Sequence, residues 1–358
     1  MTFHRISLGN TVFEGANNAY LHDGDATVLL DTGVAVPDTR QELEAGLTEH
    51  GIAFADIDAI VLTHYHADHT GLAGEIQAES GATVYAHEAD APLIAGDAAA
   101  WANLEATQRE LFDKWGMPDD AREELLAFLE AGEEAGIYGE AVDVTPITDG
   151  DTLSVGDLRL EVLHAPGHTA GLCCFVPQRE TGTGAAVYTG DALLPQYTPN
   201  VGGADVRLEG ALAAYVETLE TLIDRGYARA WPGHRTPIDE PAERARHILE
   251  HHEERAFRVA SALEAIGPAD AWTVSARLFG DLSDIHILHG PGEAFAHLEH
   301  LRDTGAVAIE RREHDAIDQH DRAAVDGHPY RLTEAGRTQL AACSDGRWPL
   351  STARDTID

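Results

Sequence analysis

The stretch THYHADH, Thr63–His69, follows directly on the apolar run AIVL. Residues two apart in an extended backbone point the same way, so His64 and His66 can bind one metal ion together. Asp68 and His69 then turn toward a second ion as a helix begins. Imidazole nitrogens and a carboxylate oxygen suit Zn²⁺, and also iron or manganese. The stretch therefore predicts a metal site at the end of a strand.

Three further motifs carry the same chemistry, and each closes a predicted strand. They are APGHTAG with His168, TGD with Asp191 and WPGH with His234. A lone His-X-His is common on protein surfaces. Five histidines and two aspartates at successive strand ends are hard to obtain by chance.

The chain up to about residue 238 alternates β-rich runs with helical or glycine-rich stretches. This alternation is typical of an α/β protein with polar residues at its strand ends. The expected strands are 26–33, 59–64, 82–87, 158–168, 172–177 and 186–191, and the expected helices are 37–50, 71–80 and 210–226.

Residues 88–140 interrupt this alternation and carry 14 acidic and three basic residues. Apolar side chains recur there at helical spacing, and a second helix is expected over 119–135. A solvated helical hairpin that docks through one apolar stripe is favoured over a lid on the site.

The composition changes after Pro241. Residues 1–239 hold 11 basic and 40 acidic residues (net −29), whereas 240–358 hold 13 and 22 (net −9). A long helix ending at Gly267, two shorter helices and two strand-like runs fit a winged helix. We therefore expect a catalytic domain at 1–240, a winged-helix-like domain at 241–345 and a tail at 346–358.

Taken in order, these motifs resemble the metallo-β-lactamase superfamily of hydrolases over residues 10–240. The resemblance implies a four-layer αβ/βα sandwich, in which two sheets pack face to face between helices and the metals lie at one edge. It also implies two metal sites that share one bridging carboxylate. The ligands would be His64, His66 and His168 for the first metal, Asp68, His69 and His234 for the second, and Asp191 for both.

Two zinc ions are the expected cofactors, with iron or manganese as alternatives, and Asp68 and Asp191 are the expected catalytic residues. An aspartate at the bridging position is similar to the glyoxalase II and ribonuclease branches, whereas the commonest zinc β-lactamases use cysteine as a ligand. Only 42 residues separate Asp191 from His234, too few for the domain that RNA-processing exonucleases insert there. The segment HHEERAFRVASAL and the region after it resemble the tail of β-lactamase-like protein 2 and related bacterial hydrolases.

These features predict a hydrolase that attacks with a metal-bound hydroxide. A small thioester or related acyl substrate ranks ahead of single-stranded RNA, because the chain has no basic stripe and its acidic catalytic domain repels phosphates. A mononuclear-iron persulfide dioxygenase needs only the first ligand set, and a non-catalytic winged-helix regulator could use the same scaffold. Asn17, Asn18, Tyr20 and the loop 193–203 suit either substrate contact or turn chemistry.

The charge balance points to the solution in which the chain folds. Lys+Arg total 24 against 62 Asp+Glu, a net charge of −38, and Lys114 is the only lysine. The hydrophobic share of 44% excludes a charge-extended disordered chain. Self-repulsion on this scale becomes tolerable in concentrated salt, so we expect a halophilic source.

Other classes are disfavoured by the same inspection. No apolar run is long enough to span a membrane, and the first residues lack the apolar core of a signal peptide. Three cysteines cannot form a disulfide framework. We expect a cytoplasmic protein without a membrane partner, acting on a small molecule, with a homodimer as an open alternative.

We predict that the protein loses structure on dialysis from molar KCl to about 10 mM buffer, because the screening of its acidic side chains disappears. Far-UV circular dichroism across a KCl series measures this loss. An unchanged spectrum at the lowest salt would contradict the prediction.

Overall fold

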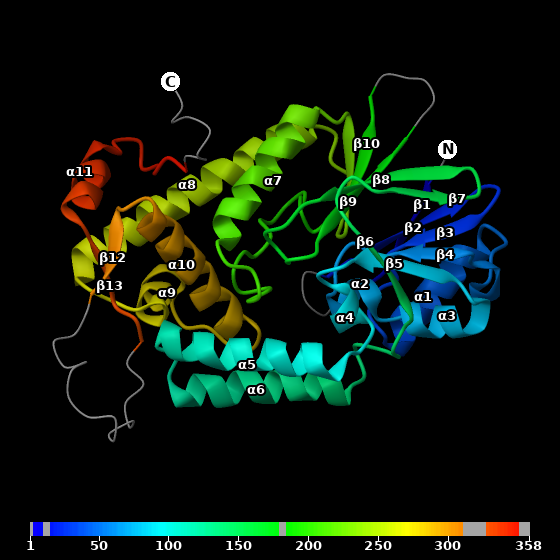
Figure 1. Cartoon of the computed structure of the whole chain (residues 1–358), viewed down its shortest axis with the longest axis horizontal. Coiled ribbons are helices and arrows are strands. Elements are labelled where there is room, and N and C mark those ends of the chain that lie inside the picture. The colour runs from blue at the N-terminus through cyan, green and yellow to red at the C-terminus, as the bar shows by residue number, and fades with distance from the viewer. Residues whose placement is uncertain (1–2, 10–14, 179–183, 311–326, 351–358) are drawn as a thin grey trace. The chain divides into compact units, whose positions relative to one another are not determined.

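The computed structural model describes residues 3–9, 15–178, 184–310 and 327–350, and the chain forms two compact units (Figure 1). The first unit comprises Met1–Ala102, Ala131–Pro199 and Thr218–Arg246. The second comprises Asn103–Glu130, Asn200–Glu217 and His247–Asp358.

The first unit is built on two β-sheets, drawn in blue to cyan and in green in Figure 1. In the first sheet the neighbours are β1 (Phe3–Ser7), β2 (Asn18–Asp23), β3 (Thr27–Leu30), β4 (Ala59–Val61), β5 (Thr83–His87) and β6 (Val144–Ile147), in that order. The first three strands are antiparallel, and β3 to β6 run parallel.

The second sheet has the order β11-β10-β9-β8-β7. Its strands are β7 (Thr152–Val155), β8 (Leu158–His164), β9 (Cys173–Pro177), β10 (Ala186–Gly190) and β11 (Arg229–Pro232). All neighbours are antiparallel except β10 and β11, which run parallel.

One apolar core joins the two sheets. Val28 and Val61 of the first sheet belong to the same buried cluster as Leu160, Val162 and Phe175 of the second. All residues of β3 and β4 are buried, as expected of strands covered on both faces. Two sheets therefore pack face to face, and the predicted α/β sandwich is confirmed.

Helices complete the first unit. In the first sheet, α1 (Pro37–Thr48) packs against β1, and α3 (Ala73–Ser80) packs against β5. The short helices α2 (Ala67–Thr70) and α4 (Ala91–Ile94) follow β4 and β5. Two longer helices, α7 (Ala211–Arg225) and α8 (Pro241–Ile266), belong partly to each unit.

Several strands end earlier than the sequence predicts, among them β4 at Val61, and the backbone explains two of these cases. The expected strand 26–33 stops at Leu30, because Asp31 has a φ of +55° and leaves the extended conformation. The expected strand 158–168 stops at His164, because the following residues include Pro166 and Gly167, the latter with a φ of +142°.

Helices α5 (Ala98–Trp115) and α6 (Asp119–Glu134) form the helical hairpin expected within 88–140. On α5 only Leu104, Phe112 and Trp115 are buried. The Trp115 ring lies 5.9 Å from that of Phe295 in the same second unit. The hairpin thus docks through one apolar stripe.

The second unit continues with α9 (Ala271–Phe279), α10 (His286–Asp303), the antiparallel pair β12 (Val307–Ile309) and β13 (Tyr330–Leu332), and α11 (Glu334–Ala342). Helix α10 includes Pro291 within its length. The winged-helix interpretation stays a prediction, because residues 311–326 between the two strands lie outside the described residues, as does the tail from 351.

Two buried histidines face each other inside the second unit. His297 Nδ1 donates to the carbonyl oxygen of Glu293 at 2.8 Å, so in the neutral ring Nε2 accepts from His252 Nδ1 at 3.3 Å. Burial lowers the pKa of His297 to about 3 and that of His252 well below its usual range. Both rings are therefore neutral in the folded protein at pH 7.

We predict that acid destabilises the protein partly through this pair. Below about pH 6.5 the unfolded chain protonates both rings while the folded chain does not, so stability falls with pH by about 1.4 kcal/mol per pH unit for each ring. His297→Gln removes one ring and should reduce the slope by that amount. Urea unfolding at several pH values, all in molar KCl, measures it.

The matched control is His286→Gln on the same helix, where the side chain is exposed. An equal reduction of slope in both variants would show that the buried pair is not the source.

Candidate metal centre

Four of the predicted ligands lie where β4 passes into α2. His64 and His66 follow the strand, and Asp68 and His69 lie in the first turns of the helix. The other three lie after β8, β10 and β11, as His168, Asp191 and His234. Strands from both sheets thus end at one place.

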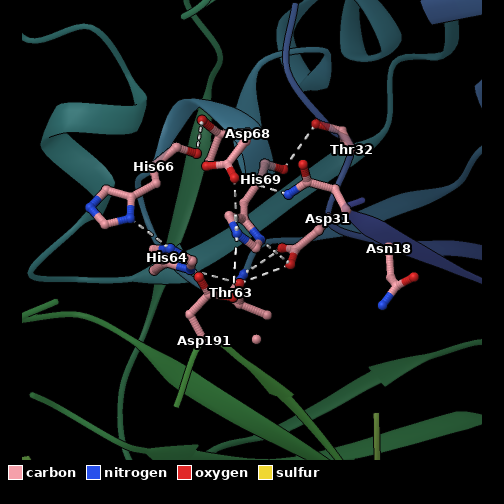
Figure 2. A network of polar contacts seen from close by, with 12 residues as sticks. Asn18, Asp31, Thr32, Thr63, His64, His66, Asp68, His69 and Asp191 are labelled. Atoms are coloured by element: carbon pink, nitrogen blue, oxygen red, sulfur yellow. Dashed lines mark hydrogen bonds and ion pairs between the residues drawn. The ribbon is translucent and has the colours of Figure 1, made fainter. Parts of the chain in front are cut away.

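The first group consists of three imidazoles. His66 Nδ1 lies 3.0 Å from His64 Nε2 and 3.1 Å from His168 Nε2. Ligand atoms of all three lie within 4.8 Å of one another. Figure 2 shows the His64 and His66 rings side by side at the end of the loop. Such a set suits a divalent metal ion.

The second group consists of Asp68, His69 and His234. Asp68 Oδ2 lies 3.9 Å from His69 Nε2 and 3.5 Å from His234 Nε2. These ligand atoms also lie within 4.8 Å of one another. A carboxylate with two imidazoles is a second donor set for a divalent ion.

Asp191 lies between the two groups. Its Oδ1 is 3.6 Å from His69 Nε2, and its Oδ2 is 3.3 Å from His234 Nε2 and 3.7 Å from His168 Nε2. The carboxylate therefore faces both groups. Its Oδ1 faces the second group only, and its Oδ2 faces both groups.

Burial tests whether this donor set fits a cation. Among the described residues, His69 Nε2, His234 Nε2 and Asp191 Oδ1 are buried without a hydrogen-bond partner. Buried polar atoms normally have one, so such atoms call for a ligand of another kind. All three are metal-ligating atoms directed at one another, and the set fits a divalent metal ion.

The charges of the site shift the pKa values in opposite directions. Burial, with neighbouring His69 and His66, holds the pKa of His64 well below its usual range. Burial also lowers the pKa of His234, but Asp191 outweighs it and raises the value to about 9. Burial opposes ionisation of Asp191, yet His234 and His69 hold its pKa well below normal. The carboxylate is thus charged and available to a cation.

Asp31 positions a ligand of the centre, and it was not among the site residues predicted from the sequence. Its Oδ2 accepts from His69 Nδ1 at 2.8 Å and from Thr63 Oγ1 at 2.9 Å, and its Oδ1 accepts from the Thr63 amide at 2.8 Å (Figure 2). A donor at Nδ1 leaves the lone pair of His69 on Nε2, on the side of the other ligands. The available signal was an aspartate that closes a buried strand.

Other contacts fix the remaining ligands. His234 Nδ1 donates to the carbonyl of Gly15 at 3.0 Å, and Asn17 Nδ2 donates to Asp68 Oδ2 at 3.0 Å. Gly233 admits no side chain, because a Cβ there would collide with Asp191 Oδ1. These contacts explain why the glycine of the WPGH motif stands beside the histidine.

The residues Asn18 and Tyr20 support the strand that leads to His234. Asn18 Nδ2 and Tyr20 Oη both donate to the carbonyl of Pro232, at 2.9 and 2.6 Å. Both side chains are buried. Their position fits packing and turn chemistry rather than substrate contact.

The family model described as "Metallo-beta-lactamase superfamily" matches residues 12–234. The chain belongs to this superfamily. A solved metallo-beta-lactamase family protein from Thermus thermophilus is 29% identical, with a TM-score of 0.73 over 92% of this chain and 98% of that one. A beta-lactamase domain protein from Burkholderia ambifaria has the same fold, at 19% identity and a TM-score of 0.69, over 92% of both chains.

Among curated relatives, two proteins of Emericella nidulans are each 25% identical to this chain. One is the lactamase-like protein aptB, matched over 70% of this chain and 61% of its own length. The other is an atrochrysone carboxyl ACP thioesterase, matched over 63% of this chain and 53% of its own length. The chain thus spans between half and two thirds of these relatives. Most members of the superfamily are hydrolases, which supports the predicted enzyme class at the level of the family.

No helix among the described residues is long and apolar enough to cross a membrane.

We predict that Asp31→Asn weakens metal binding by about 10–100-fold, because the amide cannot supply the charge that orients and polarises His69. A competition titration against a graded chelator, with elemental analysis of the protein, measures the affinity.

The control is Asp157→Asn. Asp157 also pairs with a histidine, His22 at 3.2 Å, but its side chain is 40% exposed and it belongs to neither metal-binding group. Equal affinities of the Asp31 variant and the wild type would show that the carboxylate is not needed.

Proposed function

We propose that this chain is a dinuclear metal-dependent hydrolase of a small thioester or related acyl ester. The position of Asp191 carries the proposal, because its Oδ2 faces His168 of the first group and His234 of the second, and its Oδ1 faces His69 of the second. Zinc is the proposed metal, because imidazole and carboxylate donors in sets of three and four suit it, with iron or manganese as alternatives.

Each group would hold one cation. His64, His66 and His168 would hold the first, Asp68, His69 and His234 the second, and Asp191 would contact both. Cations held there would supply Lewis acidity, which acidifies water and stabilises negative charge on a carbonyl oxygen.

The side chains of the site would then set the reaction geometry. The carboxylate of Asp191 would orient the attacking water, and that of Asp68 would accept its proton. Asn17, which donates to Asp68 Oδ2, would keep that carboxylate in place. The small exposed fractions of the ligands (3% for Asp191 and 1% for His234) mean that few water molecules compete for these contacts.

Two observations favour a thioester. A thiolate leaves without a proton near neutral pH, since thiols ionise near pH ~8.5, so the site needs no separate general acid. One curated relative is a thioesterase by name. Against RNA, residues 1–239 carry a net charge of −29, which repels phosphates at ordinary ionic strength.

We predict two zinc ions per chain and hydrolysis of S-acyl thiols that Asp191→Asn reduces by about 10²–10³-fold or more, because one carboxylate then no longer serves both donor groups. Elemental analysis and a thiol-release assay in molar KCl measure the two quantities. A labelled single-stranded RNA and a set of lactones are tested in parallel.

Asp239→Asn is the matched control, since Asp239 is 74% exposed, pairs with Arg229 and belongs to none of the metal-binding groups. If the wild type cleaves RNA, Asp191→Asn does not, and neither protein hydrolyses the thioesters, the nuclease would be favoured. One iron held by the three histidines alone would favour the persulfide dioxygenase. No turnover at full metal content would favour the non-catalytic regulator.

A further inference from the structure

Two exposed side chains adjoin the metal centre along the chain. Arg235 follows His234, and Tyr197 lies six residues after Asp191. The guanidinium carbon of Arg235 lies 4.9 Å from the centroid of the Tyr197 ring. The Tyr197 side chain is 48% exposed and that of Arg235 is partly exposed. A cation–aromatic pair that reaches solvent is therefore carried by the same two segments as His234 and Asp191.

The backbone of Arg235 is held in an uncommon conformation. Its φ is +64°, in the left-handed region that non-glycine residues seldom adopt. Its amide donates to the carbonyl of Ala16 at 2.9 Å. Its own carbonyl accepts from Arg5 Nη1 at 2.7 Å and from Asn18 Nδ2 at 3.0 Å. Such a conformation persists only where the surroundings enforce it, and it occurs preferentially at functional sites.

The loop that carries Tyr197 is held by another arginine. Arg244 donates through Nε to the carbonyl of Leu194 at 2.7 Å and through Nη2 to that of Tyr197 at 2.8 Å. The backbone carbonyls of both members of the pair are thus held by other arginines, that of Arg235 by Arg5 and that of Tyr197 by Arg244.

The stacking explains what such a pair can bind. A guanidinium that lies over an aromatic ring keeps its N–H donors in the plane of the group, where they match the two oxygens of a carboxylate. The tyrosine fixes the orientation of the plane, so less side-chain freedom is lost on binding. The pair is therefore suited to a planar anion that approaches the metal centre.

We propose that the Tyr197–Arg235 pair, whose backbone Arg5 and Arg244 hold in place, binds a carboxylate of the substrate that lies within a few bonds of the scissile carbonyl. Because Arg235 adjoins His234 in the chain, an anion that it binds lies within the length of one arginine side chain of the backbone that carries this ligand. This short reach favours the free carboxylate of a half-thioester over the distant phosphate of a long carrier. The inference rests on the proposed function and names its substrate class.

The test compares succinyl and butyryl thioesters of the same neutral thiol, which differ mainly in the terminal carboxylate. The wild type should show a higher kcat/KM for the succinyl compound. Arg235→Gln should reduce the succinyl-to-butyryl ratio of kcat/KM by about 10–100-fold, the size expected for a lost charge-assisted contact. A second comparison uses acetyl thioesters of a carboxylated thiol and of a neutral thiol. Their kcat/KM values show whether the bound carboxylate belongs to the leaving group instead.

The control variant is Arg229→Gln. Arg229 also lies over an aromatic ring, 5.5 Å from the centroid of Trp231, but it pairs with Asp239. Its loss should leave the ratio unchanged. Tyr197→Leu provides a second variant should Arg235→Gln fold poorly, and it should lower the ratio because the guanidinium loses its stacking partner. Arg235→Lys keeps the charge without the planar fork and should restore only part of the ratio.

The outcomes separate the two proposals. Equal hydrolysis of both thioesters, with a ratio that neither Arg235→Gln nor Tyr197→Leu alters, overturns the carboxylate site and leaves the hydrolase standing. If the enzyme prefers the carboxylated thiol over the neutral thiol but does not prefer the succinyl over the butyryl group, the bound carboxylate belongs to the leaving group. That result overturns the half-thioester assignment. Inert thioesters at full metal content overturn the proposed function and this inference with it.

Discussion

The hydrogen bond from His69 Nδ1 to Asp31 is the contact on which the geometry of the centre depends. Asp31 follows β3 and also binds Thr63 after β4, so one carboxylate ties together two neighbouring strand ends of the first sheet. The other nitrogen of the same ring then faces Asp191, which follows β10 of the second sheet. The bond thus connects the alignment of strands in one sheet with the position of a side chain in the other.

Burial makes this arrangement demanding. Removing a carboxylate from water is costly unless charges or hydrogen bonds compensate. Asp31 is satisfied entirely by protein donors, whereas Asp191 Oδ1 has no hydrogen-bond partner among the described residues. The two buried carboxylates therefore differ in kind: the first positions a ligand, and the second is left for a cation. The opposite pKa shifts of His64 and His234 follow from the same division, since only the second has Asp191 as its dominant neighbour.

Much of this could be predicted from the sequence, because the decisive side chains lie close together in it. The run from His64 to His69 places four donor side chains within six residues, although His64 and His66 lie in the loop after β4 rather than in the strand that was expected to hold them. The grouping of His168, Asp191 and His234 with that run came from a resemblance, since nothing local specifies which strand ends meet. Asp31 shows why the remainder could not be predicted. A single aspartate at the end of a strand has no spacing to distinguish it, and its role depends on the pairing of β3 with β4. For the hairpin, helical spacing predicted the apolar stripe but could not identify Phe295 as the partner of Trp115.

One electrostatic argument covers both the acidic composition and the Tyr197–Arg235 pair. If the chain works in concentrated salt, as its composition predicts, interactions between exposed charges decay over a Debye length of only about 3 Å at 1 M. Long-range attraction or repulsion then contributes little to the approach of a charged substrate, and recognition has to rest on groups in direct contact. A guanidinium fixed by stacking on Tyr197 and by a constrained backbone supplies such a contact at low entropic cost. The net charge of −38 is therefore compatible with a site that binds carboxylates. Salt screens the long-range repulsion between the acidic surface and the substrate, and the direct contact with the guanidinium remains.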